Sequence, residues 1–407
     1  MPPAEPARAP SGDCLLFATA DWDTPYWTNK QHTAAHLAMA GWRVLYVESI
    51  GLRAPKIGSG TDWARIARRL WRGLRGPRKV AEGLWVFSPL VIPFRHDHPV
   101  IRGLNRFLLG GTLQRFMTRQ RFQRSMVWTY HPYVLDLLDQ LHADATTITG
   151  PLVYHCVDDL SAIPGIDADA FNAEERRLLQ RADCVFTTSP ALHAKCSAHH
   201  KRVHDFPNVV DAEHFGRARL PGDLPGDLQS IPSPRLVYVG ALSDFKVDFP
   251  LLEQVARAHP QWQVVLIGEE REGQADPQLA SLAQLPNVHR LGHRPYQRLP
   301  DYLRGMDVGL LPTRINDYTR SMFPMKYFEY LAAGVPVVST PLEFTRDHAH
   351  GLAIGADAIG FAEAVAAQLR RGRLTDNEVA SFVGENTWLH RLNKMLSLLT
   401  GHPETEP

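Results

Sequence analysis

The residues best suited to chemistry lie between positions 311 and 341, where a polar loop leads into a helical pattern. Pro324 suits the first turn of that helix, Lys326 follows it, and Glu329 lies three residues further along the same side. A helix N-terminus presents N–H groups without intrahelical partners and a partial positive charge. With the added charge of Lys326, the segment predicts a site for an anion such as phosphate. The alternative is an ordinary surface pair between Lys326 and Glu329.

Polar residues also follow two predicted strands in the first half of the chain. His131 comes after the strand at 126–129, and Asp158 comes after the strand at 152–155. Parallel strands bring their carboxyl ends to one sheet edge, so His131 is a candidate ligand contact and Asp158 a candidate base. The alternatives are a histidine that caps a loop and a carboxylate that caps a helix. His155 lies within its strand and fits a core position.

The loop after the first predicted strand, residues 21–30, is both polar and aromatic. Its candidate ligand contacts are Asp21, Trp22 and Trp27. Aromatic faces stack on the C–H faces of sugars while carboxylates accept hydrogen bonds from hydroxyls, so this loop suits a carbohydrate. A packed turn is the alternative.

The elements that must position these residues alternate between strand and helix. Short apolar runs predict strands at 14–19, 43–47, 84–87, 126–129, 152–155 and 184–188, and then at 235–239, 263–267, 288–291, 308–311 and 335–339. Helical patterns fill gaps between them, as at 30–40, 168–182, 249–258, 297–305 and 324–333. This alternation predicts an α/β protein with parallel sheets.

A stretch rich in Pro, Gly, Asp and Ser at 216–234 is predicted to be a linker. It separates an N-terminal domain at 1–215 from a C-terminal domain at 235–384. Two doubly wound domains of this kind are expected to face each other across a cleft that holds the ligand.

The whole chain of 407 residues carries a formal charge of only +1, with 44% hydrophobic residues. This composition excludes a disordered tail, a collagen, a small disulfide scaffold and a globally basic nucleic-acid binder. The charge is nevertheless uneven, because residues 61–124 hold 14 Lys and Arg against three acids.

Within this basic region, residues 63–74 are predicted to form a helix with Trp and Leu on one face and arginines on the rest. Such a helix is typical of docking at an anionic membrane surface. The residues expected to dock are Trp63, Arg65, Arg68, Arg69, Trp71, Arg72 and Arg75. Packing on the first domain is the main alternative, and nucleic-acid binding is a weaker one.

The four cysteines are scattered, without the close spacing of a metal site. They are expected to be reduced thiols, which fits a cytoplasmic protein. The N-terminus has no signal-peptide pattern, and no run of about 20 apolar residues predicts a membrane span.

The segment that contains Lys326 resembles the donor-binding signature of nucleotide-sugar glycosyltransferases with the GT-B fold, of the group 1 or family 4 type. Residues 329–338 match the family's motif of an acidic residue, a small apolar run and Gly-x-Pro-Val-Val. Pro324, Lys326, Glu329 and Tyr330 match a helix start found in one branch of the family. The resemblance implies that Glu329 binds the ribose hydroxyls of the donor.

Four further motifs occur in the family's order. Residues 208–211 resemble the turn that closes the first domain, and 238–242 with Lys246 resemble the diphosphate element that opens the second. Residues 291–294 resemble the nucleobase loop. Residues 385–388 resemble the start of a helix, about 385–400, that packs back on the first domain.

The resemblance implies a donor site within the C-terminal domain. Its residues are Gly240, Lys246, His293, Arg294, Thr313, Ser321, Met322, Phe323, Lys326 and Glu329. Two positions depart from the family pattern: Ala241 replaces an arginine, and Ser321 replaces a second glutamate that contacts the donor sugar.

The implied function is transfer of a sugar from a nucleotide diphosphate sugar to a lipid-linked or polysaccharide acceptor at the inner face of a membrane, with retention of configuration. Lys246, Lys326 and the helix terminus would replace a metal at the diphosphate, and no cofactor is expected. The alternatives are a nucleotide-sugar epimerase of the same fold and a non-catalytic binding partner of a membrane assembly.

Overall fold

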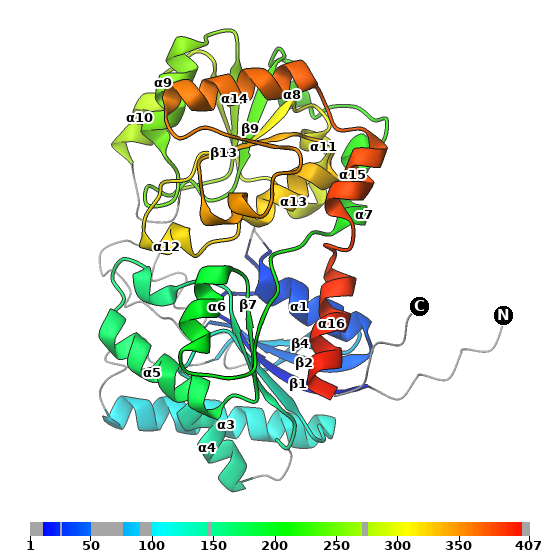
Figure 1. Cartoon of the computed structure of the whole chain (residues 1–407). Coiled ribbons are helices and arrows are strands. Elements are labelled where there is room, and N and C mark those ends of the chain that lie inside the picture. Colours follow the sequence, from blue (N-terminus) through cyan, green and yellow to red (C-terminus); the bar gives the residue numbers. More distant parts are fainter. Residues whose placement is uncertain are drawn as a thin grey trace, which may run out of the picture. The chain divides into compact units, whose positions relative to one another are not determined.

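The computed structural model describes residues 11–24, 27–49, 76–89, 99–144, 148–270 and 276–400 (Figure 1). The chain divides into two compact units. Unit 1 comprises residues 1–206 and 392–407, and unit 2 comprises residues 207–391. Each unit is built around a largely parallel sheet, so the predicted α/β class is confirmed.

Unit 1 contains an eight-stranded sheet in the order β3-β4-β2-β1-β5-β6-β7-β8. All neighbours are parallel except β3 and β4. The strands are β1 (Gly12–Phe17), β2 (Trp42–Val47), β3 (Arg78–Ala81), β4 (Leu84–Phe87), β5 (Met126–Thr129), β6 (Leu152–Cys156), β7 (Cys184–Thr187) and β8 (Val203–Asp205). Because β1 lies between β2 and β5, the chain changes direction across the sheet there, which is where ligands bind in such folds.

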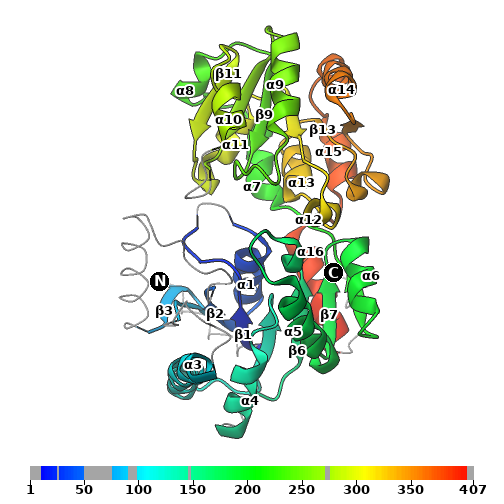
Figure 2. The same ribbon diagram turned by 90° about the vertical axis from the view of Figure 1, so that its left-hand side faces the viewer.

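Helices cover both faces of this sheet, which explains why its strands are almost continuously apolar. On one face, α1 (Asn29–Met39) and α16 (Trp388–Thr400) pack against strand residues such as Leu16 and Val44. On the other, α3 (Pro99–Gln120) and α4 (Leu135–Asp144) pack against Leu15 and Leu45. Two further helices, α5 (Ala168–Arg181) and α6 (Pro190–Ser197), cover β6 and β7. Figure 2 shows α3 and α4 on the side of the sheet away from α16.

Unit 2 contains a six-stranded parallel sheet in the order β11-β10-β9-β12-β13-β14. The strands are β9 (Arg235–Val239), β10 (Gln263–Ile267), β11 (Val288–Gly292), β12 (Val308–Leu311), β13 (Val337–Ser339) and β14 (Leu352–Ile354). The change of direction falls between β9 and β12. Most of the predicted donor residues follow these two strands, while His293 and Arg294 follow β11.

Two layers of helices enclose the second sheet. One layer consists of α9 (Phe249–Ala258), α10 (Pro277–Leu282) and α14 (Ala358–Arg371). The other consists of α7 (Ala212–Gly216), α11 (Leu299–Leu303), α13 (Met325–Ala332) and α15 (Asp376–Val383). Side-chain caps begin several of these helices, as where Asp248 accepts a hydrogen bond from the Leu251 N–H of α9.

The segment at 216–234 is not the linker that its composition predicts. It belongs to unit 2 and contains the 3-10 helix η2 (Arg217–Arg219) and the short helix α8 (Gly226–Gln229). Leu228 and Ile231 are buried in the core of unit 2. Pro and Gly prevent long elements here, but the apolar residues between them still pack.

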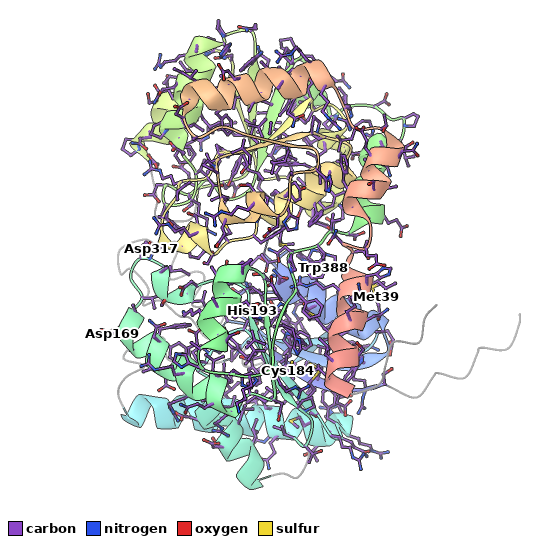
Figure 3. All side chains as sticks on the ribbon, viewed as in Figure 1. Met39, Asp169, Cys184, His193, Asp317 and Trp388 are labelled. Carbon is purple, nitrogen blue, oxygen red and sulfur yellow. The ribbon has the colours of Figure 1, made fainter. Side chains whose placement is uncertain are left out.

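Two other expectations concern the cysteines and the membrane. The four cysteines are buried free thiols, and Cys184 lies in β7 (Figure 3). No helix in the described ranges is long and apolar enough to cross a bilayer. The predicted membrane-docking helix at 63–74, with its seven candidate residues, lies outside the described part of the chain.

Candidate functional site

Helix α13 is held firmly on the second sheet by an aromatic side chain. The Tyr330 hydroxyl accepts a hydrogen bond from the Val239 N–H of β9 at 2.9 Å. The Tyr330 ring lies against Gly309 of β12, where a Cβ atom would come within 2.5 Å of it. A larger residue at position 309 would therefore displace the helix that carries Lys326 and Glu329.

The N-terminus of α13 carries a pair of opposite charges and no side-chain cap. The Lys326 Nζ lies 2.5 Å from the Glu329 Oε2, and Glu329 is only 3% exposed. Pro324 is the N-cap residue and makes no side-chain capping bond, so the helix begins one residue later than predicted. The leading N–H groups therefore have no side-chain acceptor, which favours an anion there.

The loop after β9 brings a second lysine to the same edge of the sheet. The Lys246 ammonium donates to the Tyr318 hydroxyl at 3.1 Å and lies 4.6 Å from the centre of its ring. Tyr318 belongs to the short helix α12 (Asp317–Arg320), which forms in the predicted polar loop. Nearby in sequence, the buried Ser243 hydroxyl has no hydrogen-bond partner among the described residues. Gly240 directly follows β9 and leads into this loop.

Four of the other predicted donor residues lie in packed positions. Thr313, after β12, accepts a hydrogen bond at its carbonyl from the Thr340 hydroxyl at 2.7 Å. The Ser321 hydroxyl donates to the Tyr318 carbonyl at 2.9 Å, so a serine here completes the end of α12. Phe323 is buried against other aromatic rings, and Met322 is partly buried beside the same cluster.

Arg294 is engaged within unit 2. Its guanidinium donates to the Tyr302 hydroxyl at 2.6 Å and forms an ion pair with Asp227 of α8. Burial opposes ionisation of Asp227, but the hydrogen bonds from Arg294 and Tyr302 hold the pKa of this carboxyl below its usual value. The Arg294 side chain thus joins α8 to α11. The loop at His293 remains the predicted nucleobase contact.

Tyr296 is a residue beside the predicted nucleobase loop that the sequence did not single out. Burial is the main cause of its raised pKa, and the charges of Glu329 and Asp211 add to it. Its ring stacks on His214 at 4.2 Å. Tyr296 lies two residues after the predicted nucleobase loop. This position in the sequence could have marked it as a candidate residue.

In unit 1, His131 lies after β5 and is only 2% exposed. The Thr129 hydroxyl donates to its carbonyl at 2.7 Å, which fixes the turn. Burial lowers the pKa of His131 to about 4, so its imidazole is neutral at neutral pH. Its Nδ1 atom has no hydrogen-bond partner among the described residues. A neutral imidazole with an unused polar atom suits a ligand hydroxyl.

Asp158 lies after β6 and faces a lysine from α1. The Lys30 Nζ is 3.5 Å from the Asp158 Oδ2, and it lies 5.6 Å from the centre of the Tyr130 ring. The structure therefore joins residues that follow β1, β5 and β6 at one sheet edge. The alternative role of helix cap falls to Asp159 instead, which caps the 3-10 helix η1 (Leu160–Ala162).

His155 occupies a core position, fully buried and hydrogen bonded. The Trp128 Nε1–H donates to its Nδ1 at 3.3 Å.

The aromatic loop after β1 is packed around a buried carboxylate. The centres of the Trp22 and Trp27 rings lie 5.0 Å apart. The backbone N–H of Trp22 donates to the Glu48 carboxylate at 2.8 Å. Glu48, at the end of β2, is 3% exposed, and the Ser88 hydroxyl also donates to it. The Asp21 carbonyl accepts from the Gln31 amide at 2.9 Å. Glu48 is a second residue that sequence patterns did not indicate.

Comparisons with known proteins show what the chain is similar to. Residues 233–371 match the model of the family described as glycosyl transferases group 1. The chain is 28% identical over 320 residues to the putative teichuronic acid biosynthesis glycosyltransferase TuaH of Bacillus subtilis (strain 168). The matched residues cover 70% of this chain and 79% of the relative.

Solved structures share the fold at low identity. Anabaena Alr3699/HepE, in complex with UDP, is 14% identical with a TM-score of 0.64, covering 96% of this chain and 100% of that one. WaaG, a glycosyltransferase involved in lipopolysaccharide biosynthesis, is 12% identical with a TM-score of 0.61, covering 95% and 100%.

The two Rossmann-like units share the GT-B fold of these solved structures, and the family and relative matches identify a nucleotide-sugar glycosyltransferase. Within the second unit, residues 233–371 are similar to the glycosyl transferases group 1, and TuaH is a relative with a related description. Because this is a family of transferases, sugar transfer is favoured over the epimerase and non-catalytic alternatives.

Proposed function

We propose that this glycosyltransferase moves a sugar from a nucleoside diphosphate sugar to a lipid-linked or polysaccharide acceptor at an anionic membrane surface. The observation that carries the proposal is the start of α13, where Lys326 and the nearly buried Glu329 lie at a helix N-terminus without a side-chain cap.

On the donor side, Glu329 accepts hydrogen bonds from the ribose hydroxyls. Lys326, Lys246 and the N–H groups of α13 bind the diphosphate. A lysine about 4 Å from a phosphate gains on the order of 4 kcal/mol at an effective dielectric of 20. An ammonium has three N–H donors, so Lys326 can keep its bond to Glu329 while it binds phosphate. These cations stabilise the charge that develops on the leaving diphosphate, without a metal.

On the acceptor side, the sheet edge of unit 1 provides the polar groups. His131, neutral because of burial, exchanges a hydrogen bond with a sugar hydroxyl. Asp158 orients the acceptor hydroxyl or receives its proton, and Lys30 holds the carboxylate in place. Asp21, Trp22 and Trp27 are the proposed carbohydrate contacts of the preceding loop.

The nature of the acceptor is supported by relatives and by charge. One relative is named for teichuronic acid biosynthesis, and one structural neighbour for lipopolysaccharide biosynthesis. The basic region at 61–124 supports docking of the enzyme at anionic lipid, on the cytoplasmic side.

The test is an incubation of the full chain with a panel of nucleotide sugars, with and without membrane lipid extract. We expect release of nucleoside diphosphate that depends on the extract and persists in a metal chelator. Donor interconversion without an acceptor would instead indicate an epimerase, and binding without turnover would indicate a non-catalytic partner. The anomeric configuration of the product, measured by NMR, tests retention.

A further inference from the structure

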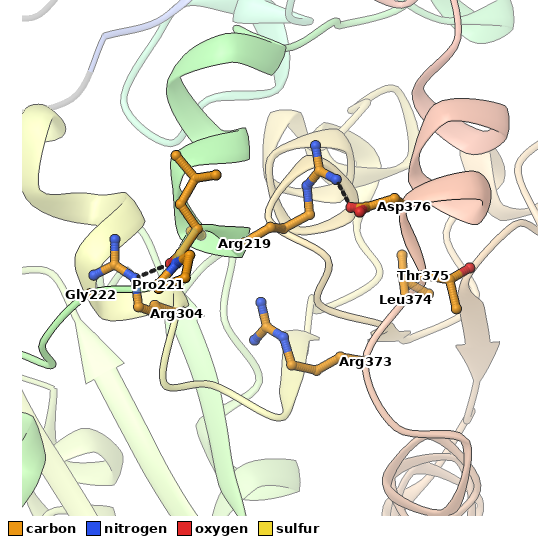
Figure 4. A pocket seen from close by; sticks show the side chains of 10 residues that line it. Arg219, Pro221, Gly222, Arg304, Arg373, Leu374, Thr375 and Asp376 are labelled. Carbon is orange, nitrogen blue, oxygen red and sulfur yellow. Dashed lines mark hydrogen bonds and ion pairs between the residues drawn. The ribbon is translucent and has the colours of Figure 1, made fainter.

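Unit 2 contains a cavity that the donor site does not use. Its volume is about 480 Å³, and it lies where η2, α11 and the start of α15 meet (Figure 4). Its principal lining residues are Arg219, Leu220, Arg304, Arg373, Leu374 and Asp376. Its walls touch the C-terminal end of α13, because the Arg373 guanidinium donates to the Ala333 carbonyl at 2.6 Å. Lys326 lies at the other end of this helix, about 10 Å away along its axis at 1.5 Å per residue.

The lining residues of the cavity carry more positive than negative charge. Three arginines line it, and Asp376 is the one carboxylate among the lining residues. Two of the guanidinium groups are held mainly by neutral backbone carbonyls: Arg373 by Met306 and Ala333, and Arg304 by Leu220. Asp301 also pairs with Arg304 from outside the lining. Carbonyls orient a guanidinium without cancelling its charge, so a positive excess remains.

The third arginine has a partner that an anion can displace. Arg219 forms an ion pair with Asp376, whose side chain is 84% exposed. Exposed ion pairs contribute little free energy, because water screens them and two side chains must be held in place. A phosphate group carries more charge than a carboxylate and accepts two parallel N–H bonds from one guanidinium. It would therefore replace Asp376 at Arg219.

We propose that this cavity binds the phosphate group of a small phosphorylated metabolite. Arg219, Arg373 and Arg304 are the proposed phosphate contacts. The volume is within the range of small-molecule sites and exceeds what a phosphate ion needs, which leaves room for a sugar-sized remainder. Leu220 and Leu374 supply the apolar wall for that remainder.

The experiment uses the full chain with two probes, pyrophosphate and a hexose 6-phosphate, at constant ionic strength. Hydrogen–deuterium exchange reports where each probe binds. We expect protection of peptides that span 217–223, 302–306 and 372–377. Protection confined to residues 321–330 would place the probes in the donor site and would overturn the cavity proposal while leaving the proposed function intact. No protection at either site would also overturn it.

Two substitutions of opposite effect test the site by calorimetric affinity for the hexose 6-phosphate. Arg219→Gln removes a proposed phosphate contact and should weaken binding by roughly tenfold. Asp376→Asn removes the competing carboxylate and should strengthen binding severalfold. Arg257→Gln and Glu253→Gln are the matched controls, since these residues form an exposed ion pair on α9. Equal changes in the test and control variants would mean that only net charge matters, and would refute the site.

Discussion

At the scale of single residues, Lys326 and Glu329 form an ion pair near the N-terminus of α13, and burial of the Glu329 carboxylate costs free energy. A carboxylate as buried as Glu329 needs a charged partner, and Lys326 supplies it from three residues away. In the proposed donor site, the same lysine binds a phosphate. The sequence predicted the pair from its spacing, but the burial of Glu329 is visible only in the fold.

Replacing Glu329 by Gln should weaken nucleoside diphosphate binding by about tenfold to a hundredfold, the value of a hydrogen bond to a charged group. Lys326→Ala should weaken it similarly by removing a phosphate contact. Isothermal titration calorimetry with UDP, the nucleotide bound in the HepE structure, measures both. Glu253→Gln, from the exposed pair on α9, is the control and should bind normally. Unchanged affinity in both test variants would remove the donor-site assignment.

Asp158 and its neighbour Asp159 allow a direct separation of catalysis from structure. Asp158→Asn should lower kcat by about 10²-fold or more if the carboxylate receives the acceptor proton. Asp159 caps η1 and pairs with Lys195, so Asp159→Asn should mainly lower the free energy of unfolding. Steady-state kinetics and urea unfolding of both variants measure the difference. Loss of kcat in Asp159→Asn alone would contradict this division of roles.

His131 predicts a pH dependence of stability. Burial lowers its pKa to about 4, while the unfolded chain protonates near pH 6.5. The unfolded state therefore binds more protons between these values, so stability falls as pH is lowered from 6.5 to 4 and this contribution is constant below pH 4. The loss is on the order of 3 kcal/mol. Urea unfolding across this range should show a shallower decline in His131→Gln, and identical slopes would refute the prediction.

At the scale of elements, the helix at 324–333 was predicted within one residue at each end, because Pro324 and Gly334 mark its ends. Its placement was not predictable, since it depends on Tyr330, Gly309 and Val239 from three separate segments. The linker prediction at 216–234 was wrong for a related reason. The composition of this segment indicates only that it cannot form a long helix or strand. It does not show that residues elsewhere in the chain bury Leu228 and Ile231.

The packing of α13 can be tested with a single methyl group. Gly309→Ala places a Cβ atom against the Tyr330 ring, so it should lower the free energy of unfolding by about 1–3 kcal/mol and weaken UDP binding. Gly226→Ala is the control, because a Cβ atom there meets no atom within 4 Å. Urea unfolding and calorimetry measure the two effects. Normal UDP affinity in Gly309→Ala would show that the donor site does not depend on this contact.

At the scale of the whole molecule, near-neutrality conceals a strong separation of charge. The basic excess of residues 61–124 is balanced by about ten net negative charges elsewhere in the chain. The proposed docking at an anionic surface depends on this one region, while the overall charge of the chain stays near zero.

Binding to vesicles tests this separation. We expect co-sedimentation with anionic but not with zwitterionic vesicles, falling as salt shortens the Debye length. Changing Arg65, Arg68, Arg69 and Arg72 to Gln should reduce binding at least tenfold, since each basic residue contributes about 1 kcal/mol. The control changes four exposed arginines outside the region, Arg176, Arg177, Arg257 and Arg298, to Gln. Binding that is insensitive to lipid charge and salt would contradict the membrane proposal.

The α/β class, most strands and the helix of the donor motif could be predicted from the amino-acid sequence, because each depends on local periodicity and end signals. The sequence also indicated the charged pair at that helix, since residues three apart share one face.

Which distant residues meet depends on the fold as a whole. Lys30 and Asp158 are 128 positions apart, and the Tyr296 ring stacks on His214 from another part of the chain. The arginines that line the cavity likewise come from separate segments, namely η2, the residue after α11 and the segment before α15. No local pattern encodes such pairs, because they arise from strand order and from the way each helix packs on its sheet.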